Sequence, residues 1–165
     1  MEKLHSGDIE IMIARHLNPR LNLIVPNVSW GLGSYEKDLL VLTPNGYAWE
    51  IEIKVSKSDL IADKKKTHGH YSNLIKRLYF AVPEYLEKDA LLHIPERAGL
   101  FIITNPFTKN GKYIDSYVNL VKAPLINTKA TKLSDKQIKK LYELSAMRLW
   151  SLKEVIYRLQ RNKHD

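Results

Sequence analysis

The sequence predicts an α/β or α+β domain in which a mixed central sheet is flanked by helices. Apolar residues recur at helical spacing near both ends of the chain, and alternating or continuous apolar runs typical of strands lie between them. Strands interleaved with helices favour a mixed sheet. The 165 residues are enough to bury one self-sufficient core.

The first half of the chain is predicted to begin with a helix and to continue into paired strands. Ile9, Ile13 and Leu17 follow one another at spacings of four, and Pro19 ends this helix. A later helix can be capped by Ser56 or Ser58. The expected elements are a helix over 7–17, strands over 37–43 and 47–55, and a helix over about 57–66.

The second half is predicted to alternate strands with loops and to close with two helices. Capping-box spacings at Ser134-x-x-Gln137 and Ser151-x-x-Glu154 mark the start of each closing helix. The expected strands lie over 78–82, 99–104 and 113–121, after a short helical or irregular stretch around 71–76. We therefore expect a core over 1–128, with basic C-terminal helices over 129–165 packed on the same domain.

The composition excludes several classes of protein. The chain contains no cysteine, which rules out disulfide scaffolds, thiolate metal sites and cysteine nucleophiles. A bound metal would need oxygen or imidazole ligands. The apolar runs are far shorter than the ~20 residues that cross a bilayer, and the beginning of the chain does not resemble a signal peptide. We expect a cytoplasmic protein without membrane contact.

The net charge of +8 favours a polyanionic partner. The excess of basic residues lies toward the C-terminal end, where Lys132, Lys136, Lys139 and Lys140 form a basic helix face. Nucleic acid is the usual partner of such a surface, because lysine and arginine release the counterions condensed on phosphates. Solubility alone is the alternative explanation.

The strongest chemical pattern is the predicted hairpin. Strict alternation places Glu50, Glu52 and Lys54 on one face of a strand. Pro44-Asn45-Gly46 fits a three-residue loop, which places Asp38 directly opposite Glu52. A two-residue Asn-Gly loop would instead place Asp38 opposite Ile53.

Two opposed carboxylates need a compensating charge. At 5 Å and an effective dielectric constant near 20 they repel by about 3 kcal/mol. A divalent cation bound by both would remove this repulsion, and Mg²⁺ prefers such oxygen ligands. With Lys54 to stabilise charge on a phosphate, the set suits metal-assisted phosphodiester hydrolysis. The same alternation also fits any half-solvated antiparallel strand.

The chain resembles the PD-(D/E)XK nuclease superfamily at Asp38, Glu52-Ile53-Lys54 and Glu10. More narrowly, the segments 52–65 and 77–83 resemble the MmcB-like group of DNA repair proteins. This resemblance implies a restriction-endonuclease-like αβββαβ core. It further implies Asp38 and Glu52 as metal ligands, Lys54 as the catalytic lysine and Glu10 as a supporting acid.

Other polar residues near the hairpin receive lesser roles. We interpret Glu50 as flanking or structural, and His68 and His70 as solvated or facing phosphate rather than metal. Asp59 and Asp63 suit the dipole of their helix. Lys64, Lys65 and Lys66 either follow a phosphate backbone or form a solvated face, and Tyr79 and Phe80 are expected in the core.

These patterns favour a Mg²⁺-dependent DNA endonuclease or repair nuclease, with Mn²⁺ as a substitute. A DNA-binding accessory protein of the same fold that does not cleave is the alternative, and an RNA-directed or scaffold protein is a third. A homodimer or a protein partner is expected to supply targeting.

Overall fold

The computed structural model describes residues 3–29, 35–64, 70–104 and 117–162. The chain divides into two compact units, Met1–Lys132 and Leu133–Asp165. The first unit contains the sheet, and the second consists mainly of one helix. In chain order the elements are α1 (Ser6–His16), β1 (Leu23–Val28), β2 (Lys37–Leu42), β3 (Ala48–Ile53), α2 (Lys57–Lys64), β4 (Ile75–Pro83), the 3₁₀ turn η1 (Glu84–Leu86), α3 (Glu87–His93), β5 (Gly99–Ile103), β6 (Val118–Lys122) and α4 (Asp135–Arg161).

The sheet has six strands in the order β1-β2-β3-β4-β5-β6. The pairs β3–β4 and β4–β5 are parallel, and the remaining pairs are antiparallel. This open mixed sheet confirms the predicted α+β class. The succession α1-β1-β2-β3-α2-β4 is the αβββαβ order that the family resemblance implied, so the fold is consistent with a restriction-endonuclease-like core.

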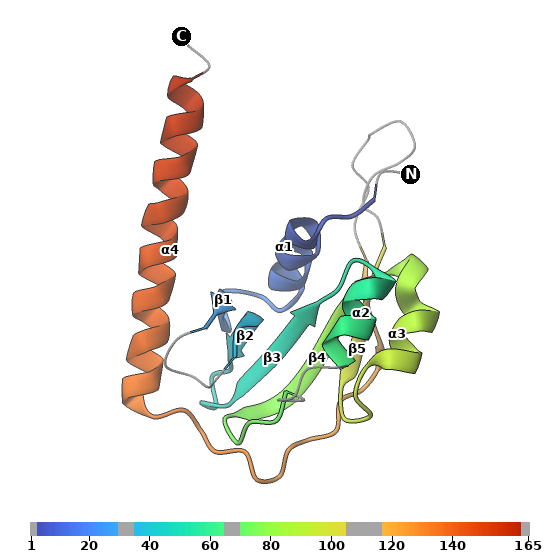
Figure 1. Ribbon diagram of the computed structural model, residues 1–165. Coiled ribbons are helices and arrows are strands. Elements are labelled where there is room, and N and C mark those ends of the chain that lie inside the picture. Colours follow the sequence, from blue (N-terminus) through green and yellow to red (C-terminus); the bar gives the residue numbers. More distant parts are fainter. Residues whose placement is uncertain (1–2, 30–34, 65–69, 105–116, 163–165) are drawn as a thin grey trace. The chain divides into compact units, whose positions relative to one another are not determined.

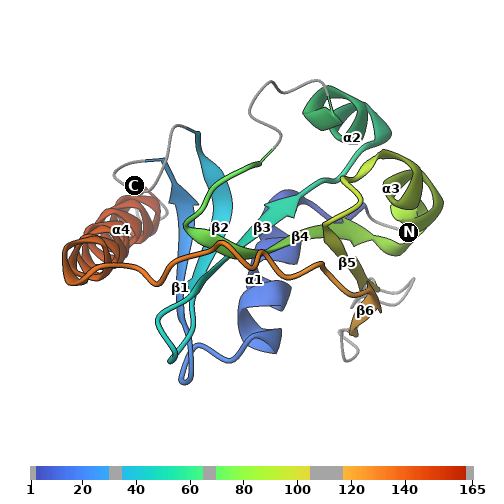
Figure 2. The same ribbon diagram turned by 90° about the horizontal axis from the view of Figure 1, so that it is seen from below.

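Helices cover both faces of the sheet, with α1 on one face and α2 and α3 on the other (Figure 1, Figure 2). Alternation along the strands divides the core accordingly. Ile51 and Ile53 of β3 pack in the cluster that contains α1 residues, whereas Leu78 and Phe80 of β4 pack in the cluster with α2 and α3. The even-numbered side chains of β3 therefore lie on the face opposite α1.

Most predicted elements are confirmed to within a few residues, but the short helix α3 and the strand β1 were missed. The sequence of β1, Leu-Ile-Val-Pro-Asn-Val, contains Pro26, which cannot donate a hydrogen bond to a neighbouring strand. That proline is tolerated because β1 is the edge strand of the sheet. The strand predicted over 113–121 corresponds in part to β6, and residues 113–116 lie outside the described residues.

The prediction of two C-terminal helices is wrong, because α4 is a single helix of 27 residues. Ser134 caps it as expected, with its hydroxyl accepting from the Gln137 amide at 3.3 Å. Ser151 does not begin a second helix. Its hydroxyl donates to the carbonyl of Met147 at 3.0 Å, one turn earlier in α4, so the local polar group is satisfied without a helix break.

Candidate functional site

The register of the β2–β3 hairpin follows from its turn. Thr43 N donates to Tyr47 O at 3.0 Å, and Gly46 N donates to Thr43 O at 2.9 Å. Gly46 has φ of 81°, the left-handed conformation that a three-residue loop requires. Leu39 consequently pairs with Ile51, and the same register places Asp38 opposite Glu52. The predicted three-residue loop is confirmed.

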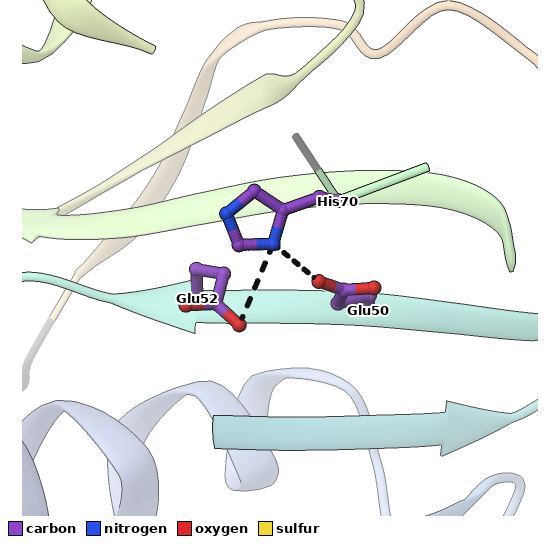
Figure 3. A group of neighbouring side chains, drawn as sticks. All are labelled: Glu50, Glu52 and His70. Atoms are coloured by element: carbon purple, nitrogen blue, oxygen red, sulfur yellow. Dashed lines mark hydrogen bonds and ion pairs between the residues drawn. The ribbon is translucent and has the colours of Figure 1, made fainter. Parts of the chain in front are cut away.

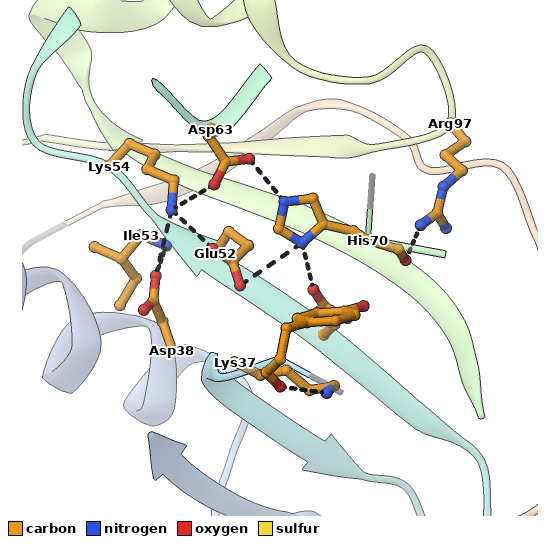
Figure 4. Close-up of polar contacts among 10 residues, drawn as sticks. Lys37, Asp38, Glu52, Ile53, Lys54, Asp63, His70 and Arg97 are labelled. Atoms are coloured by element: carbon orange, nitrogen blue, oxygen red, sulfur yellow. Dashed lines mark hydrogen bonds and ion pairs between the residues drawn. The ribbon is translucent and has the colours of Figure 1, made fainter. Parts of the chain in front are cut away.

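Lys54 is the centre of an ion-pair network at the end of this hairpin (Figure 4). Its Nζ lies 2.7 Å from Glu52 Oε2, 3.2 Å from Asp63 Oδ1 and 3.7 Å from Asp38 Oδ2. Asp38 Oδ2 also accepts from the Ile53 amide at 2.7 Å. One ammonium thus reaches carboxylates from β2, β3 and α2, and it provides the compensating charge that the opposed pair needs.

His70 bridges two further carboxylates. Its Nδ1 lies 2.7 Å from Glu50 Oε1 and its Nε2 lies 2.7 Å from Asp63 Oδ2. The imidazole is 1% exposed, and the Glu50 and Asp63 side chains are 0% and 4% exposed. Only a protonated imidazole donates from both nitrogens. Asp38, Glu50, Glu52 and Asp63 together are called the carboxylate cluster below.

Tyr35, which lies two positions before β2, and Lys37, the first residue of β2, also contact the cluster or each other. Tyr35 donates its hydroxyl to Glu50 Oε2 at 2.8 Å. Lys37 is 1% exposed, donates to the carbonyl of Tyr35 at 3.1 Å and lies 4.1 Å from the centre of its ring. Burial lowers the pKa of Lys37, although Glu50 and Glu52 attract its charge. Burial, together with Glu50, raises the pKa of Tyr35.

Burial and the close ion pairs shift the pKa values of Glu52, Lys54 and His70. Burial raises the pKa of Glu52 to about 7, against the opposing attraction of Lys54. Burial lowers the pKa of Lys54, but the Glu52 carboxylate outweighs it and the net shift is upward. Burial also opposes protonation of His70, yet its hydrogen bonds to Asp63 and Glu50 raise its pKa to about 9. The carboxylates and the cations of this network therefore hold one another in their charged forms, against the cost of burial.

The donor set fits a divalent cation. Ligand atoms of Glu50, Glu52 and His70 lie within 4.8 Å of one another, and all three residues are buried (Figure 3). Carboxylate oxygens suit Mg²⁺ and Mn²⁺, and imidazole is accepted by transition metals. The Asp38 side chain is 37% exposed and that of Glu52 is 2% exposed. A cation or phosphate would therefore enter from the Asp38 side.

The structure brings together three of the four predicted catalytic residues, namely Asp38, Glu52 and Lys54. Glu10 is half-buried on α1, whose buried residues pack on the face of the sheet opposite Glu50 and Glu52. The supporting role predicted for Glu10 stays a prediction.

The interpretation of His70 as solvated is wrong, because the ring is buried between Glu50 and Asp63. Glu50 bonds to Tyr35 and His70, which agrees with the structural role predicted for it. Asp63 belongs to the buried network and does not act only on the dipole of its helix. Residues 65–69, which include His68, Lys65 and Lys66, lie outside the described residues. No periodicity links Asp63 to His70, and only an unusually dense set of polar residues marks this stretch.

The remaining predictions divide between core and surface. Tyr79 and Phe80 are buried at 3% and 1% exposure, which confirms their assignment to the core. On α4, Lys139 and Lys140 lie 4.0 and 3.8 Å from carboxylate oxygens of Glu143, and a DNA-binding role for this basic face stays a prediction. Across the described residues, no helix is both long and apolar enough to span a membrane.

Comparisons with known proteins give a family for this chain and a solved structure of similar fold. The family model described as DNA repair protein MmcB-like matches residues 13–154. A solved structure of a protein of unknown function from Silicibacter pomeroyi is similar, with 25% identity and a TM-score of 0.62, and the match covers 92% of this chain and 94% of that chain. Among curated proteins, no relative matches this chain.

Proposed function

The chain belongs to the MmcB-like family of DNA repair proteins, and we propose that it is a metal-dependent DNA nuclease that hydrolyses phosphodiester bonds. The observation that carries this proposal is the convergence of Asp38, Glu52 and Lys54 at the end of the β2–β3 hairpin. Their arrangement combines two carboxylates for a cation with one fixed ammonium. A role in DNA repair agrees with the family and with the positive net charge.

Asp38 and Glu52 would hold the cation, Mg²⁺ or Mn²⁺, and Glu50 offers a further carboxylate oxygen beside them. When bound, the cation supplies Lewis-acid activation of water and of a phosphoryl oxygen. Lys54 keeps its proton because of the surrounding carboxylates and would stabilise the charge that develops on the phosphate. Glu10 would support the site from α1.

Cleavage of DNA tests this proposal. Chelator-treated protein is incubated with single-stranded, nicked and branched DNA in Mg²⁺ or Mn²⁺, beside Glu52→Gln and Lys54→Met. Glu143→Gln on α4 is the control, because it removes an exposed carboxylate outside the cluster. We expect cleavage by the wild type and the control, and losses of at least ~100-fold in the other two variants. No cleavage by the wild type, or equal cleavage by Glu52→Gln, would reject catalysis.

The accessory protein that binds DNA without cleaving it is the second candidate. A specific observation favours it: Lys54 and His70 already lie within 2.7 Å of the buried Glu52 and Glu50, so protein cations stabilise these acids. In this case the wild type binds DNA, the affinity falls steeply with salt, and no product forms with either metal.

The exposed apolar side chains of α4 support a second copy of the chain, or another protein, as the partner that directs the protein to its DNA. Apolar side chains that are about half exposed or more lie along it: Tyr142, Met147, Leu149, Trp150, Leu152, Val155, Ile156, Tyr157 and Leu159. Sedimentation over a range of protein concentrations measures self-association. If the protein sediments as a monomer at every concentration, the homodimer is rejected and a different protein remains as the proposed partner.

A further inference from the structure

A cavity is lined by Tyr71 and the residues that follow it, next in the chain to His70 of the ion-pair network. It has a volume of about 490 Å³ and is lined among others by Tyr71, Asn73, Arg97, Leu125, Ile126 and Lys129. This volume is within the range of ~300–1,000 Å³ that holds small ligands. None of these residues belongs to the network described above, and we call the cavity the Tyr71 pocket.

The walls of the Tyr71 pocket are held in place by hydrogen bonds. The Asn127 side chain donates to the carbonyls of Ser72 and Ile75 at 3.3 and 3.1 Å, and its backbone amide donates to Lys76 O at 3.0 Å. Leu125 N donates to Arg97 O at 2.9 Å. The segment after β6 is thereby attached to the beginning of β4 (Figure 2), and the pocket exists before any ligand binds.

The lining combines an aromatic face with cations. Tyr71 is 77% exposed, and Leu125 and Ile126 are also exposed. The guanidinium of Arg97 lies 4.7 Å from the centre of the Tyr71 ring. Arg97 and Lys129 add two positive charges to the lining. An aromatic platform next to cationic side chains suits a nucleotide, whose base stacks and whose phosphate is attracted.

The pocket is connected to the cluster through the backbone of His70. This residue has φ of 58°, a left-handed conformation that histidine adopts more readily than most residues. Arg97 donates through Nη2 to the His70 carbonyl (Figure 4). At this turn the chain buries the His70 ring in the cluster and leaves the next side chain, Tyr71, exposed. A base on Tyr71 would therefore lie close to a phosphodiester at the carboxylate cluster.

We propose that the Tyr71 pocket binds an unpaired nucleotide, with the base stacked on Tyr71 and its phosphate held by Arg97 and Lys129. Stacking requires an exposed base face, and both faces are covered by neighbouring bases within a duplex. The substrate class is therefore single-stranded DNA, or DNA with an extruded nucleotide. This inference rests on the proposed nuclease function, because it names the kind of DNA that the nuclease would act on.

Binding in a chelator tests the pocket without cleavage. Fluorescence anisotropy measures the affinity of the full chain for a labelled single strand and for a duplex of the same sequence. Tyr71→Ala is compared with Tyr71→Trp and with Tyr117→Ala, a control that removes another exposed tyrosine. Stacking is worth ~1–3 kcal/mol per base, so Tyr71→Ala should weaken single-strand binding at least ~5-fold. Tyr71→Trp and the control should bind as the wild type does, and duplex affinity should not change.

Equal losses on single strand and duplex, or no loss on either, would overturn the pocket, as would a wild type that binds no single strand. Tighter binding of an RNA strand of the same sequence would overturn the assignment to DNA. The two proposals fail separately. If single-strand binding depends on Tyr71 but no DNA is cleaved, the pocket is retained and the nuclease is rejected. If DNA is cleaved and Tyr71→Ala changes neither cleavage nor binding, the nuclease is retained and the pocket is rejected.

Discussion

His70→Ala tests whether a charged imidazole holds the buried carboxylates together. The substitution removes both 2.7 Å contacts, to Glu50 and to Asp63, and leaves two buried acids without their shared partner. Breaking a buried charge pair from one side costs ~3–5 kcal/mol. We therefore expect the metal-free variant to lose about 4 kcal/mol of unfolding free energy near pH 6.

The dependence of this loss on pH follows from the pKa of His70, which is raised from 6.5 to about 9. At a pH above 6.5, the pKa of histidine in the unfolded chain, His70 of the folded chain keeps a proton that the unfolded chain loses. The stabilisation is complete below about pH 6.5 and disappears as the pH rises through about 9. The difference between the two pKa values corresponds to about 3 kcal/mol, so the variant should lose only ~1 kcal/mol near pH 10.

The difference in unfolding free energy between the wild type and His70→Ala is measured near pH 6 and near pH 10. The protein is unfolded with urea in the presence of a chelator, and tryptophan fluorescence follows the transition. Groups that do not interact with His70 titrate alike in both proteins and cancel in the comparison of His70→Ala with the wild type. His16→Ala, which removes an exposed imidazole, is the control for the loss of a histidine outside the cluster. A gap between wild type and His70→Ala that stays constant or widens toward alkaline pH would refute the charged bridge.

Three further results are expected. Gly46→Ala should cost ~1 kcal/mol because φ is 81°, measured by urea denaturation, and an unchanged midpoint would contradict the turn. Gly99→Ala should cost ~1–3 kcal/mol, since a new Cβ would lie 2.8 Å from the Tyr79 ring, and unaltered thermal stability would show that the strands adjust. Mn²⁺ at about 100 times its Kd should stabilise the chelator-treated wild type by ~2.7 kcal/mol and Glu52→Gln much less; equal stabilisation of both would place the ion elsewhere.

The geometry of the hairpin was largely predictable because it depends on local rules. Alternation places Glu50 and Glu52 on one face, and the Pro44-Asn45-Gly46 turn sets the register that places Asp38 opposite Glu52. The edge strand β1 was missed because Pro26 argues against a strand unless its position at the edge is known.

The local sequence pattern thus determined the strands of the hairpin, its turn, and the placement of two acids beside one lysine. Only the tertiary structure decided what completes the site. Asp63 on α2 and His70 before β4 meet Lys54 and Glu50 because the crossover from β3 to the parallel β4 passes over one face of the sheet. Contacts across such a connection depend on where the chain returns, and neither spacing nor propensity encodes that path.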